Sequence, residues 1–595
     1  MKSDEIGQTT VPGDKDIGYA QAYDENDHER DADVISINGL HRRLSNRQIQ
    51  WIAIGGSIGT ALFVSIGWGL VEGGPGSLFI SFALYCAILA LANNCMAEMT
   101  VFMPVVGGWV RMGSKWVDEA YGFMAGWNFY LYEAVLIPFE ISALNLVLTF
   151  WRDDIPVAAV VAACIVLYGA INLFAVRAYG ESEFWLASGK IILIFMLFMF
   201  TFITMVGGNP KRDAYGFRYW RDPGSFAVYD IGGHTGSLGR FEGFLGAFFQ
   251  ASFTCVGPEY VAMVAGEAIY PRKTLKTAFK TMYFRFGLFF ILGALCVGII
   301  LPYNDPTLND LLNNEGTGTG ASSPYVIAMR NMGISVLPDL TNALMVTSIF
   351  SAGNSYVYCA TRTMYSLSID GHAPRFLQKT TKAGVPIYCF CITMVFPLLA
   401  FLSVGRAASE GVKWLANITQ AAQLLDYIFM CTIYVFFYRA LQAQGISRDT
   451  LPYKGWGQPY VAYAGIVLFS VVLCIYGYAT FYAFDVGTFF TYYAMCFICV
   501  VLWIGFKVVK RSKFVKPEEA DLVWERPAID AYEASIDPPL GLWTDIWETV
   551  TLKKRKRSEG ARRDGDGGGD GRLGGDEQRG PSGKRWGGTW KPWRG

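Results

Sequence analysis

The sequence predicts an all-α, polytopic membrane protein with about twelve transmembrane helices. Of its 595 residues, 52% are hydrophobic and 17% are charged, whereas soluble domains contain about 25% charged residues. The apolar residues form runs of about 20, long enough to cross a hydrocarbon core about 30 Å thick. Two of these runs, the first and the sixth, are interrupted by glycine or Gly-Pro. Paired interruptions of this kind indicate discontinuous helices around a binding site in the membrane.

Twelve apolar segments are candidates for the spans. They lie at residues 51–70, 77–102, 121–149, 156–174, 184–206, 243–265, 281–302, 341–366, 385–404, 415–437, 461–481 and 487–506. The chain is thus divided into a polar N-terminal tail (1–47), a membrane domain (48–508) and a polar C-terminal tail (509–595). We expect the N-terminal tail and the Gly-, Arg- and Asp-rich end of the C-terminal tail to be disordered, because neither buries enough apolar surface to offset the entropy of ordering.

The distribution of lysine and arginine predicts that both ends of the chain are cytoplasmic. Basic residues gather in segments on one side of the spans, such as 41–47, 272–280 and 507–516, and are sparse in loops on the other side. Short cytoplasmic loops carry this excess of positive charge. Loop 207–242 is the exception, since it would lie outside yet is rich in arginine, and we expect it to form a small folded cap.

The first interruption reads Gly55-Gly56-Ser57-Ile58-Gly59-Thr60. A helix that unwinds inside a bilayer leaves N–H and C=O groups that protein, water or a ligand must satisfy. The half-helix that follows would begin near Thr60, where free N–H groups and the positive end of the helix dipole favour a carboxylate. The alternative is that Gly55 and Gly59 only let two helices pack closely, an interpretation that the matching break in the sixth segment weakens.

The second interruption reads Phe253-Thr254-Cys255-Val256-Gly257-Pro258. Pro258 has no N–H and disfavours helical geometry at Gly257. The carbonyls freed between Phe253 and Val256 would accept hydrogen bonds from an ammonium group. One break that favours a carboxylate and one that favours an ammonium together describe an α-amino acid.

An ordered series of motifs resembles the fungal amino acid permeases of the amino acid–polyamine–organocation superfamily. It covers most of residues 40–460 and includes IAIGGSIGT at 52–60, GGPGS at 73–77, MAEMTVFMPVVGGW at 96–109, GEAIYPRKT at 266–274 and FSAGNSYVYCATRTMYSLSIDGHAP at 350–374. The resemblance implies two inverted five-helix repeats with broken helices 1 and 6, followed by two C-terminal helices. It also implies proton-driven uptake across the plasma membrane, and lysines in the tails that accept ubiquitin from ubiquitin-ligase machinery.

The resemblance further implies which residues carry the proton. Lys190 lies on the fifth predicted span, where proton-coupled relatives place a lysine in the position of a sodium ion, close to the first and eighth helices. The alternative for Lys190 is that it extends to the inner headgroups. Glu98, Glu140 and Glu259 match family glutamates, and either relay protons, contact substrate, or belong to a polar network that holds the helices and the inner gate.

Other polar residues in the spans have a structural interpretation. Glu133 on the third span and Asn94 on the second are expected to form interhelical hydrogen bonds. Ser351 and Ser355 on the eighth span are four residues apart and share a face, which we expect to pack against the unwound first helix.

The chain departs from the family pattern at three positions. Ala61 follows Thr60 where the family usually has glycine, and Gly257-Pro258-Glu259 replaces Gly-Thr-Glu, as in the S-adenosylmethionine- and polyamine-related permeases. Asp426 lies in the middle of the tenth span, where an unpaired carboxylate costs at least ~2.5 kcal/mol on insertion scales. It either meets a second positive charge on the substrate or has a structural partner on another span.

These observations predict a proton-coupled secondary transporter that imports amino acids or related cationic amines by alternating access. A permease fold that binds substrate and signals without transport is the alternative. We expect no enzymatic activity, no metal or organic cofactor, and no nucleic-acid partner; the proton is the coupling ion, and the bilayer and a small-molecule substrate are the partners. The candidate substrate-binding residues are Gly56, Ser57, Ile58, Gly59, Thr60, Phe253, Thr254, Cys255, Val256, Gly257 and Asp426. The candidate proton-coupling residues are Lys190, Glu140 and Glu259.

Overall fold

A computed structural model describes residues 42 and 44–536, except 153, 175, 314–322, 382–383, 404–407 and 483. The predicted disorder of residues 1–41 and of the Gly-, Arg- and Asp-rich end falls outside this part of the chain. Within it, the chain forms helices joined by turns, and its β pairing is limited to two isolated bridges, Leu44 with Ala268 and Thr380 with Pro386. The prediction of an all-α fold is confirmed.

Helical elements occupy all twelve predicted spans. The first five correspond to α1 (Asn46–Ser57) with the π-helical η1 (Ala61–Ser65) and the start of α2 (Ile66–Phe102), the rest of α2, α4 (Glu119–Leu148), α5 (Val157–Phe174) and α6 (Val176–Met205). The next four correspond to α7 (Gly236–Thr254) with α8 (Pro258–Met263), α9 (Pro271–Arg285) with η4 (Phe286–Ile291) and α10 (Leu292–Ile300), α13 (Leu337–Ile369), and α14 (Ile387–Thr393) with η6 (Phe396–Ser403). The last three correspond to α15 (Ala408–Ala443), α16 (Tyr460–Tyr476) with η8 (Tyr478–Phe481), and α17 (Val486–Lys510).

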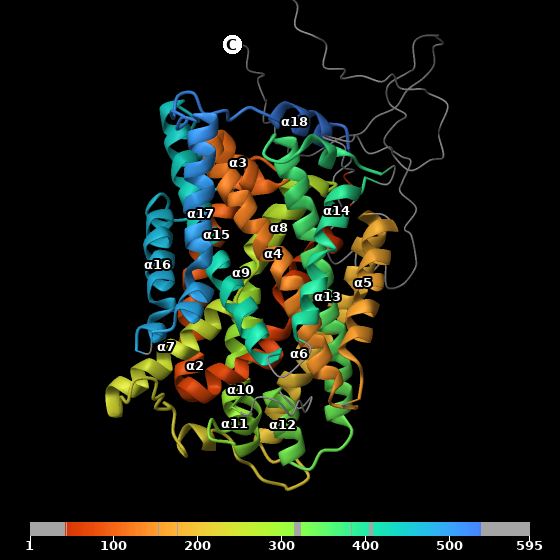
Figure 1. Ribbon diagram of the computed structural model, residues 1–595, viewed down its shortest axis with the longest axis vertical. Helices are drawn as coiled ribbons and strands as arrows, with labels where there is room; N and C mark the ends of the chain where they lie inside the picture. Colours follow the sequence, from red (N-terminus) through yellow and green to blue (C-terminus); the bar gives the residue numbers. More distant parts are fainter. Residues whose placement is uncertain are drawn as a thin grey trace, which may run out of the picture. The chain divides into compact units, whose positions relative to one another are not determined.

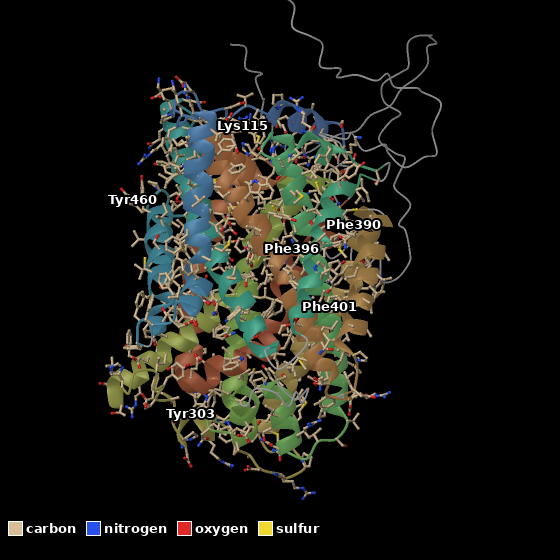
Figure 2. The ribbon with its side chains drawn as sticks, viewed as in Figure 1. Lys115, Tyr303, Phe390, Phe396, Phe401 and Tyr460 are labelled. Carbon is tan, nitrogen blue, oxygen red and sulfur yellow. The ribbon has the colours of Figure 1, made fainter. Side chains whose placement is uncertain are left out.

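Shorter helices connect the spans. They are α3 (Gly108–Trp116), η2 (Arg218–Trp220), η3 (Val264–Glu267), α11 (Pro306–Asn313), α12 (Pro324–Asn331), η5 (Arg375–Gln378), η7 (Arg448–Thr450) and α18 (Arg526–Ala534). In Figure 1, α3 and α18 lie at one end of the long helices, and α11 and α12 lie at the other end. Lys115 and Tyr303, which the sequence places on opposite sides of the membrane, lie at opposite ends of the molecule (Figure 2).

Length and composition identify membrane-crossing helices directly. Among the described residues, six helical stretches are long and apolar enough to cross a bilayer, namely Ala61–Phe102, Glu119–Leu148, Tyr179–Met205, Pro271–Ile300, Trp414–Ala443 and Val486–Lys510. Val157–Leu173, Ile387–Phe401 and Tyr460–Tyr476 are shorter apolar helices. The protein is therefore a polytopic membrane protein. The first and sixth predicted spans are each divided in two, and α13, the eighth, is a single helix that lies outside these sets.

The turn between the first two spans is a sharp kink within α2. Gly74 has φ +76°, a left-handed conformation that only glycine adopts without strain, and Pro75 follows it. The loop after α6 folds onto this kink, because the N–H of Ala227 donates to the carbonyl of Gly73 (3.0 Å) and the N–H of Gly76 donates to that of Ser225 (2.7 Å). Part of loop 207–242 is thus a folded cap over the α2 turn.

The N-terminal tail ends in a packed segment rather than a disordered one. Arg42 is 1% exposed, and its guanidinium donates to the carbonyls of Ala265 (3.3 Å), Ala268 (3.4 Å) and Pro104 (3.1 Å). The N–H of Leu44 donates to the carbonyl of Glu267 at 2.9 Å. One guanidinium thus satisfies carbonyls of two loops, and Arg42 and Leu44 pack against the helices that follow.

The segment after α17, residues 514–536, crosses the end of the molecule that carries α3 (Figure 1). We call it the C-terminal segment. Glu525 pairs with Arg111 of α3 at 3.0 Å, and Trp524 lies under the same guanidinium, 4.5 Å from the ring centroid. At its far end Glu533 pairs with Arg272 at the start of α9 (3.2 Å). The segment therefore joins α3 to α9.

A buried ion pair holds the same end of the molecule together. Arg362 of α13 donates to Glu267 of η3 at 2.9 Å, and both side chains are less than 5% exposed. The guanidinium also lies 4.3 Å from the ring centroid of Tyr358. Burial makes such a pair sensitive to the loss of either partner, because the remaining charge is left without compensation.

We predict that Arg362→Gln lowers the free energy of unfolding by about 3–5 kcal/mol, because the Glu267 carboxylate then stays buried without its cation. Thermal unfolding of the purified protein in detergent measures this. Arg218→Gln is the matched control, since the Arg218–Asp213 pair is about half exposed and such surface pairs contribute about 1 kcal/mol or less. Equal unfolding temperatures for the two variants would contradict the prediction.

Candidate functional site

The first break lies where the sequence predicts it and is shorter than predicted. α1 continues through Gly55, Gly56 and Ser57, and the chain leaves helical geometry at Ile58 (φ −124°, ψ 104°). Helical geometry resumes at Thr60. The Ser57 hydroxyl donates to the carbonyl of Ala53 in the preceding turn (2.7 Å).

Lys190 of α6 occupies the carbonyl side of this break. Its ammonium donates to the carbonyl of Gly55 at 2.5 Å and to that of Ile58 at 2.6 Å, and its side chain is fully buried. In an unbroken helix the Gly55 carbonyl would accept from the N–H of Gly59. The ammonium therefore replaces backbone hydrogen bonds that the break removes, and the alternative that Lys190 extends to the headgroups is wrong.

Glu140 of α4 occupies the N–H side of the same break. Its carboxylate accepts from the backbone N–H of Thr60 at 3.4 Å and from the Thr60 hydroxyl at 2.5 Å. The sequence predicts a carboxylate at this helix start, and in the structure the chain itself supplies one. Gly59 lies against the same group, because a Cβ there would come within 2.5 Å of the Glu140 carboxylate.

Glu183 of α6 completes this cluster and is absent from the sequence-based candidates. It accepts hydrogen bonds from the Ser351 hydroxyl and from the Asn354 amide (3.3 Å) of α13, and it interacts electrostatically with Lys190. Glu183 lies one residue before the predicted fifth span, so its position suggested a loop. Its spacing of seven residues from Lys190 is the signal that would have found it, because residues i and i+7 share a helix face.

The second break also lies where the sequence predicts it. α7 continues through Phe253 and Thr254, and the irregular backbone covers Cys255 to Gly257 before α8 begins at Pro258. Gly257 has φ +154°, and its N–H donates to the Glu259 carboxylate at 3.1 Å. As at the first break, a carboxylate of the chain holds the N–H group that the break exposes.

The other predicted substrate-binding residues at the second break are apolar, or form hydrogen bonds within their own helix. The Thr254 hydroxyl donates to the carbonyl of Gln250 in its own helix (2.8 Å). Cys255 and Val256 are buried. The ring of Phe253 packs edge-on against Phe139 of α4, with 5.4 Å between centroids.

The two breaks face each other across a short distance. α1 contacts α8, and a Cβ at Gly56 would come within 2.6 Å of the Tyr260 ring. The Tyr356 hydroxyl of α13 donates to the carbonyl of Gly56 (3.4 Å), and Ala352 of the same helix lies beside Gly59. The face of Ser351 and Ser355 is expected to pack against the first helix: a Cβ at Gly55 would lie 3.1 Å from the Ser355 hydroxyl, whereas Ser351 donates to Glu183 of α6.

Asp426 of α15 has a partner on another span, as one of its two interpretations requires. One carboxylate oxygen accepts from the Asn128 amide of α4 at 2.9 Å, and its second oxygen, Oδ2, is buried without a hydrogen-bond partner. Next to it, Tyr427 donates to the Glu259 carboxylate (3.2 Å). Glu133 of α4 is also buried, and neither of its carboxylate oxygens has a hydrogen-bond partner among the described residues. The prediction of an interhelical hydrogen bond for Glu133 is wrong.

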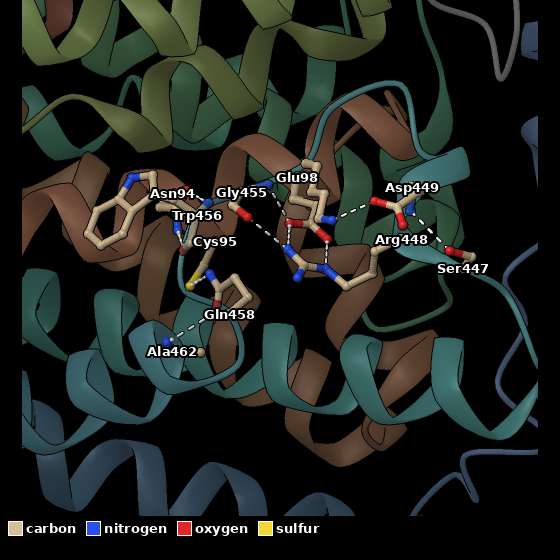
Figure 3. A network of polar contacts seen from close by, with 11 residues as sticks. Asn94, Cys95, Glu98, Ser447, Arg448, Asp449, Gly455, Trp456, Gln458 and Ala462 are labelled. Atoms are coloured by element: carbon tan, nitrogen blue, oxygen red, sulfur yellow. Dashed lines mark hydrogen bonds and ion pairs between the residues drawn. The ribbon is translucent and has the colours of Figure 1, made fainter.

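Glu98 belongs to a network away from the breaks (Figure 3). Arg448 donates to both of its oxygens (2.8 and 2.7 Å), and the N–H of Gly455 donates to one of them (2.7 Å). Asn94, one turn earlier on α2, donates to the carbonyl of Trp456 at 2.7 Å. Of the alternatives for Glu98, the geometry favours the one that holds helices together, because the network binds α2 to the loop between α15 and α16.

The chain has the sequence profile of a known family. The profile described as "Amino acid permease" matches residues 48–518. The chain belongs to the amino acid permease family. It is 44% identical over 498 residues to the general amino acid permease AGP2 of Saccharomyces cerevisiae, covering 83% of each chain. It is 36% identical over 541 residues to a lysine/arginine permease of Candida albicans, covering 88% of this chain and 93% of that one.

A proline-specific permease of Emericella nidulans is 35% identical over 494 residues, covering 82% of this permease and 89% of the relative. A solved manganese transporter of Eremococcus coleocola aligns with a TM-score of 0.49 and 13% identity, covering 82% and 95%. Family membership makes this permease a membrane transporter and not an enzyme, and the relatives do not favour the sensor alternative.

We predict that Gly59→Ala impairs transport, because the added methyl would lie 2.5 Å from the Glu140 carboxylate and 3.0 Å from the Ala352 Cβ. Overpacking of about 1–3 kcal/mol in one conformation corresponds to roughly a 5- to 150-fold shift between conformations. Labelled substrate uptake, normalised to surface protein, measures this loss. Gly287→Ala is the control, since nothing lies within 4 Å of a Cβ there, and wild-type uptake by Gly59→Ala would contradict the prediction.

Proposed function

We propose that this permease imports amino acids together with protons by alternating access across the plasma membrane, with both chain ends cytoplasmic. The observation that carries the proposal is the ammonium of Lys190, which bonds the carbonyls of Gly55 and Ile58 on both sides of the first break. A titratable group that holds a discontinuous helix links protonation to the geometry of that helix. The printed names of the relatives, which are general, lysine/arginine and proline permeases, support amino acids as the substrates.

The coupling follows from what protonation does to this contact. Protonated Lys190 carries the charge that attracts both carbonyls and interacts with Glu183 and Glu140. Loss of the proton removes that charge and leaves the two carboxylates without their cation, so α1 and α6 are held less firmly. A proton that binds one conformation more tightly than the other shifts the equilibrium by the difference in binding free energy.

The substrate acts on connected groups. The carboxylate of an amino acid that reaches the start of the second half-helix competes with Glu140 for the N–H of Thr60. Glu140 in turn interacts with Lys190. Glu259 accepts from the equivalent N–H group at Gly257. A substrate can therefore compete with the Glu259 carboxylate for this N–H group, as it can with Glu140 at the first break. Lysines of the tails that would accept ubiquitin lie mainly outside the described residues.

We predict that Lys190→Met abolishes accumulation driven by the proton gradient while substrate exchange continues. The methionine fills the same volume without a charge, so substrate sites persist and the response to the proton is lost. Accumulation driven by the proton gradient is measured as the accumulation ratio in a permease-deficient yeast at low and neutral pH, with and without an uncoupler. Substrate exchange is measured as counterflow in proteoliposomes without a proton gradient.

Lys280→Met is the matched control for this experiment, because Lys280 is exposed on α9. It should accumulate substrate as the wild type does. Uncoupler-sensitive accumulation by Lys190→Met at the wild-type ratio would remove Lys190 from the mechanism. Correct surface expression of the wild type with no accumulation of any amino acid would contradict the proposed function itself.

A further inference from the structure

Three buried carboxyl groups gather beside the two breaks. They are Glu133 on α4, Glu259 on α8 and Asp426 on α15, and each is at most 2% exposed. Glu133 interacts electrostatically with both of the others, and Asp426 interacts with Glu259. Within the described part of the chain, no lysine, arginine or histidine interacts with any of the three. This separates them from Glu98, Glu183 and Glu267, each of which meets a cationic side chain.

The hydrogen bonds of this cluster are incomplete. Glu259 accepts from the N–H of Gly257 and from Tyr427, and one oxygen of Asp426 accepts from Asn128. Both oxygens of Glu133 and the second oxygen of Asp426 are buried and have no hydrogen-bond partner in the part of the chain that the structure describes. Buried carboxylate oxygens are normally hydrogen-bonded, and an unpaired buried charge is costly. These three carboxylate oxygens therefore lack a hydrogen-bond donor within the described part of the chain.

Aromatic rings surround the unpartnered groups. Tyr132 adjoins Glu133 in α4, and the hydroxyls of Tyr132 and Tyr260 both interact electrostatically with the Glu133 carboxylate. The Tyr260 and Tyr356 rings lie 6.1 Å apart, and Tyr260 packs on Gly56 at the first break. Tyrosine faces attract alkylammonium and guanidinium groups. Carboxylates and rings together are the surroundings that an organic cation favours.

The position of the cluster relative to the breaks indicates which part of a ligand it meets. Tyr260 connects the cluster to Gly56, and Glu259 connects it to Gly257, so the cluster is continuous with both breaks. The breaks themselves offer N–H groups for a carboxylate and carbonyls for an α-ammonium. A group that reaches Glu133 and Asp426 is thus a further part of the same molecule.

We propose that Glu133, with Asp426 and Glu259, binds a second positive charge on the substrate, an alkylammonium or a guanidinium. The preferred substrates are then dibasic amino acids or amines, and Glu133 and Asp426 determine that preference. The inference rests on the proposed function, since it assumes that the two breaks bind the substrate. It does not depend on proton coupling.

The test compares substrates that differ in charge and little in shape. Arginine with citrulline, and lysine with norleucine, are matched pairs of this kind. Counterflow into proteoliposomes of the purified full-length protein, without a proton gradient, measures their relative rates. We expect the wild type to prefer the charged member by at least about tenfold, because citrulline keeps N–H donors but lacks the positive charge that would compensate the buried carboxylates.

Glu133→Gln should reduce the ratio of the arginine rate to the citrulline rate from at least about ten to about one. The change keeps the size of the side chain and removes its charge. Glu119→Gln is the matched control, since Glu119 is exposed on the first turn of the same helix. Asp426→Asn gives a second, independent variant, and the wild-type comparison needs no variant at all if Glu133→Gln does not fold.

The outcomes separate the two proposals. Equal wild-type rates for arginine and citrulline, or an unchanged preference in both Glu133→Gln and Asp426→Asn, would overturn the second-charge site while leaving amino acid transport intact. A charge preference in counterflow without any proton-driven accumulation in cells would support the second-charge site and contradict proton coupling. Preference for the neutral members would show that the three carboxyls are protonated in the transport cycle and bind no cation.

Discussion

The structure depends on one constraint: a helix that breaks inside a membrane must have its freed backbone groups satisfied by something other than water or lipid. In this permease the chain meets that constraint with charged side chains, two from neighbouring helices and one from the second broken span itself. Lys190 bonds the carbonyls at the first break, Glu140 bonds the N–H of Thr60, and Glu259 bonds that of Gly257. The same three residues are therefore structural supports, and they are also the residues to which the proposed function assigns the proton and the substrate.

The sequence predicts the parts of this arrangement that are local. The positions of the spans follow from the length of the apolar runs, and the breaks follow from glycine and Pro258, whose effect on the backbone reaches only a residue or two. The exact extent of each break does not follow, because Gly55 and Phe253 can remain helical when neighbouring hydrogen bonds favour it. The sequence places Gly55 and Phe253 in the irregular segments, and in the structure both residues are helical.

The partners of the buried charges are the part that the sequence does not predict. Glu183 meets Ser351 and Asn354 of α13, more than 160 residues along the chain, and no local pattern contains that pairing. Glu133 shows the opposite case. Its sequence context suggested an ordinary polar contact between helices, and only the three-dimensional arrangement shows that its carboxylate lacks a donor. Absence of a partner is a property of the assembled helices and cannot be read from one of them.

The C-terminal segment has a practical consequence for work on this protein. It is covalently continuous with α17, the last span, and its side chains are bonded to Arg111 of α3 and Arg272 of α9. Any rearrangement that separates α3 from α9 must stretch, slide or detach it. A fluorescent reporter fused close behind residue 536, or a shortened chain that ends at Lys510, therefore alters a mechanical linkage of the molecule. Neither change leaves the protein unaltered. Transport rates measured with either of them are those of a protein in which α3 and α9 are linked differently.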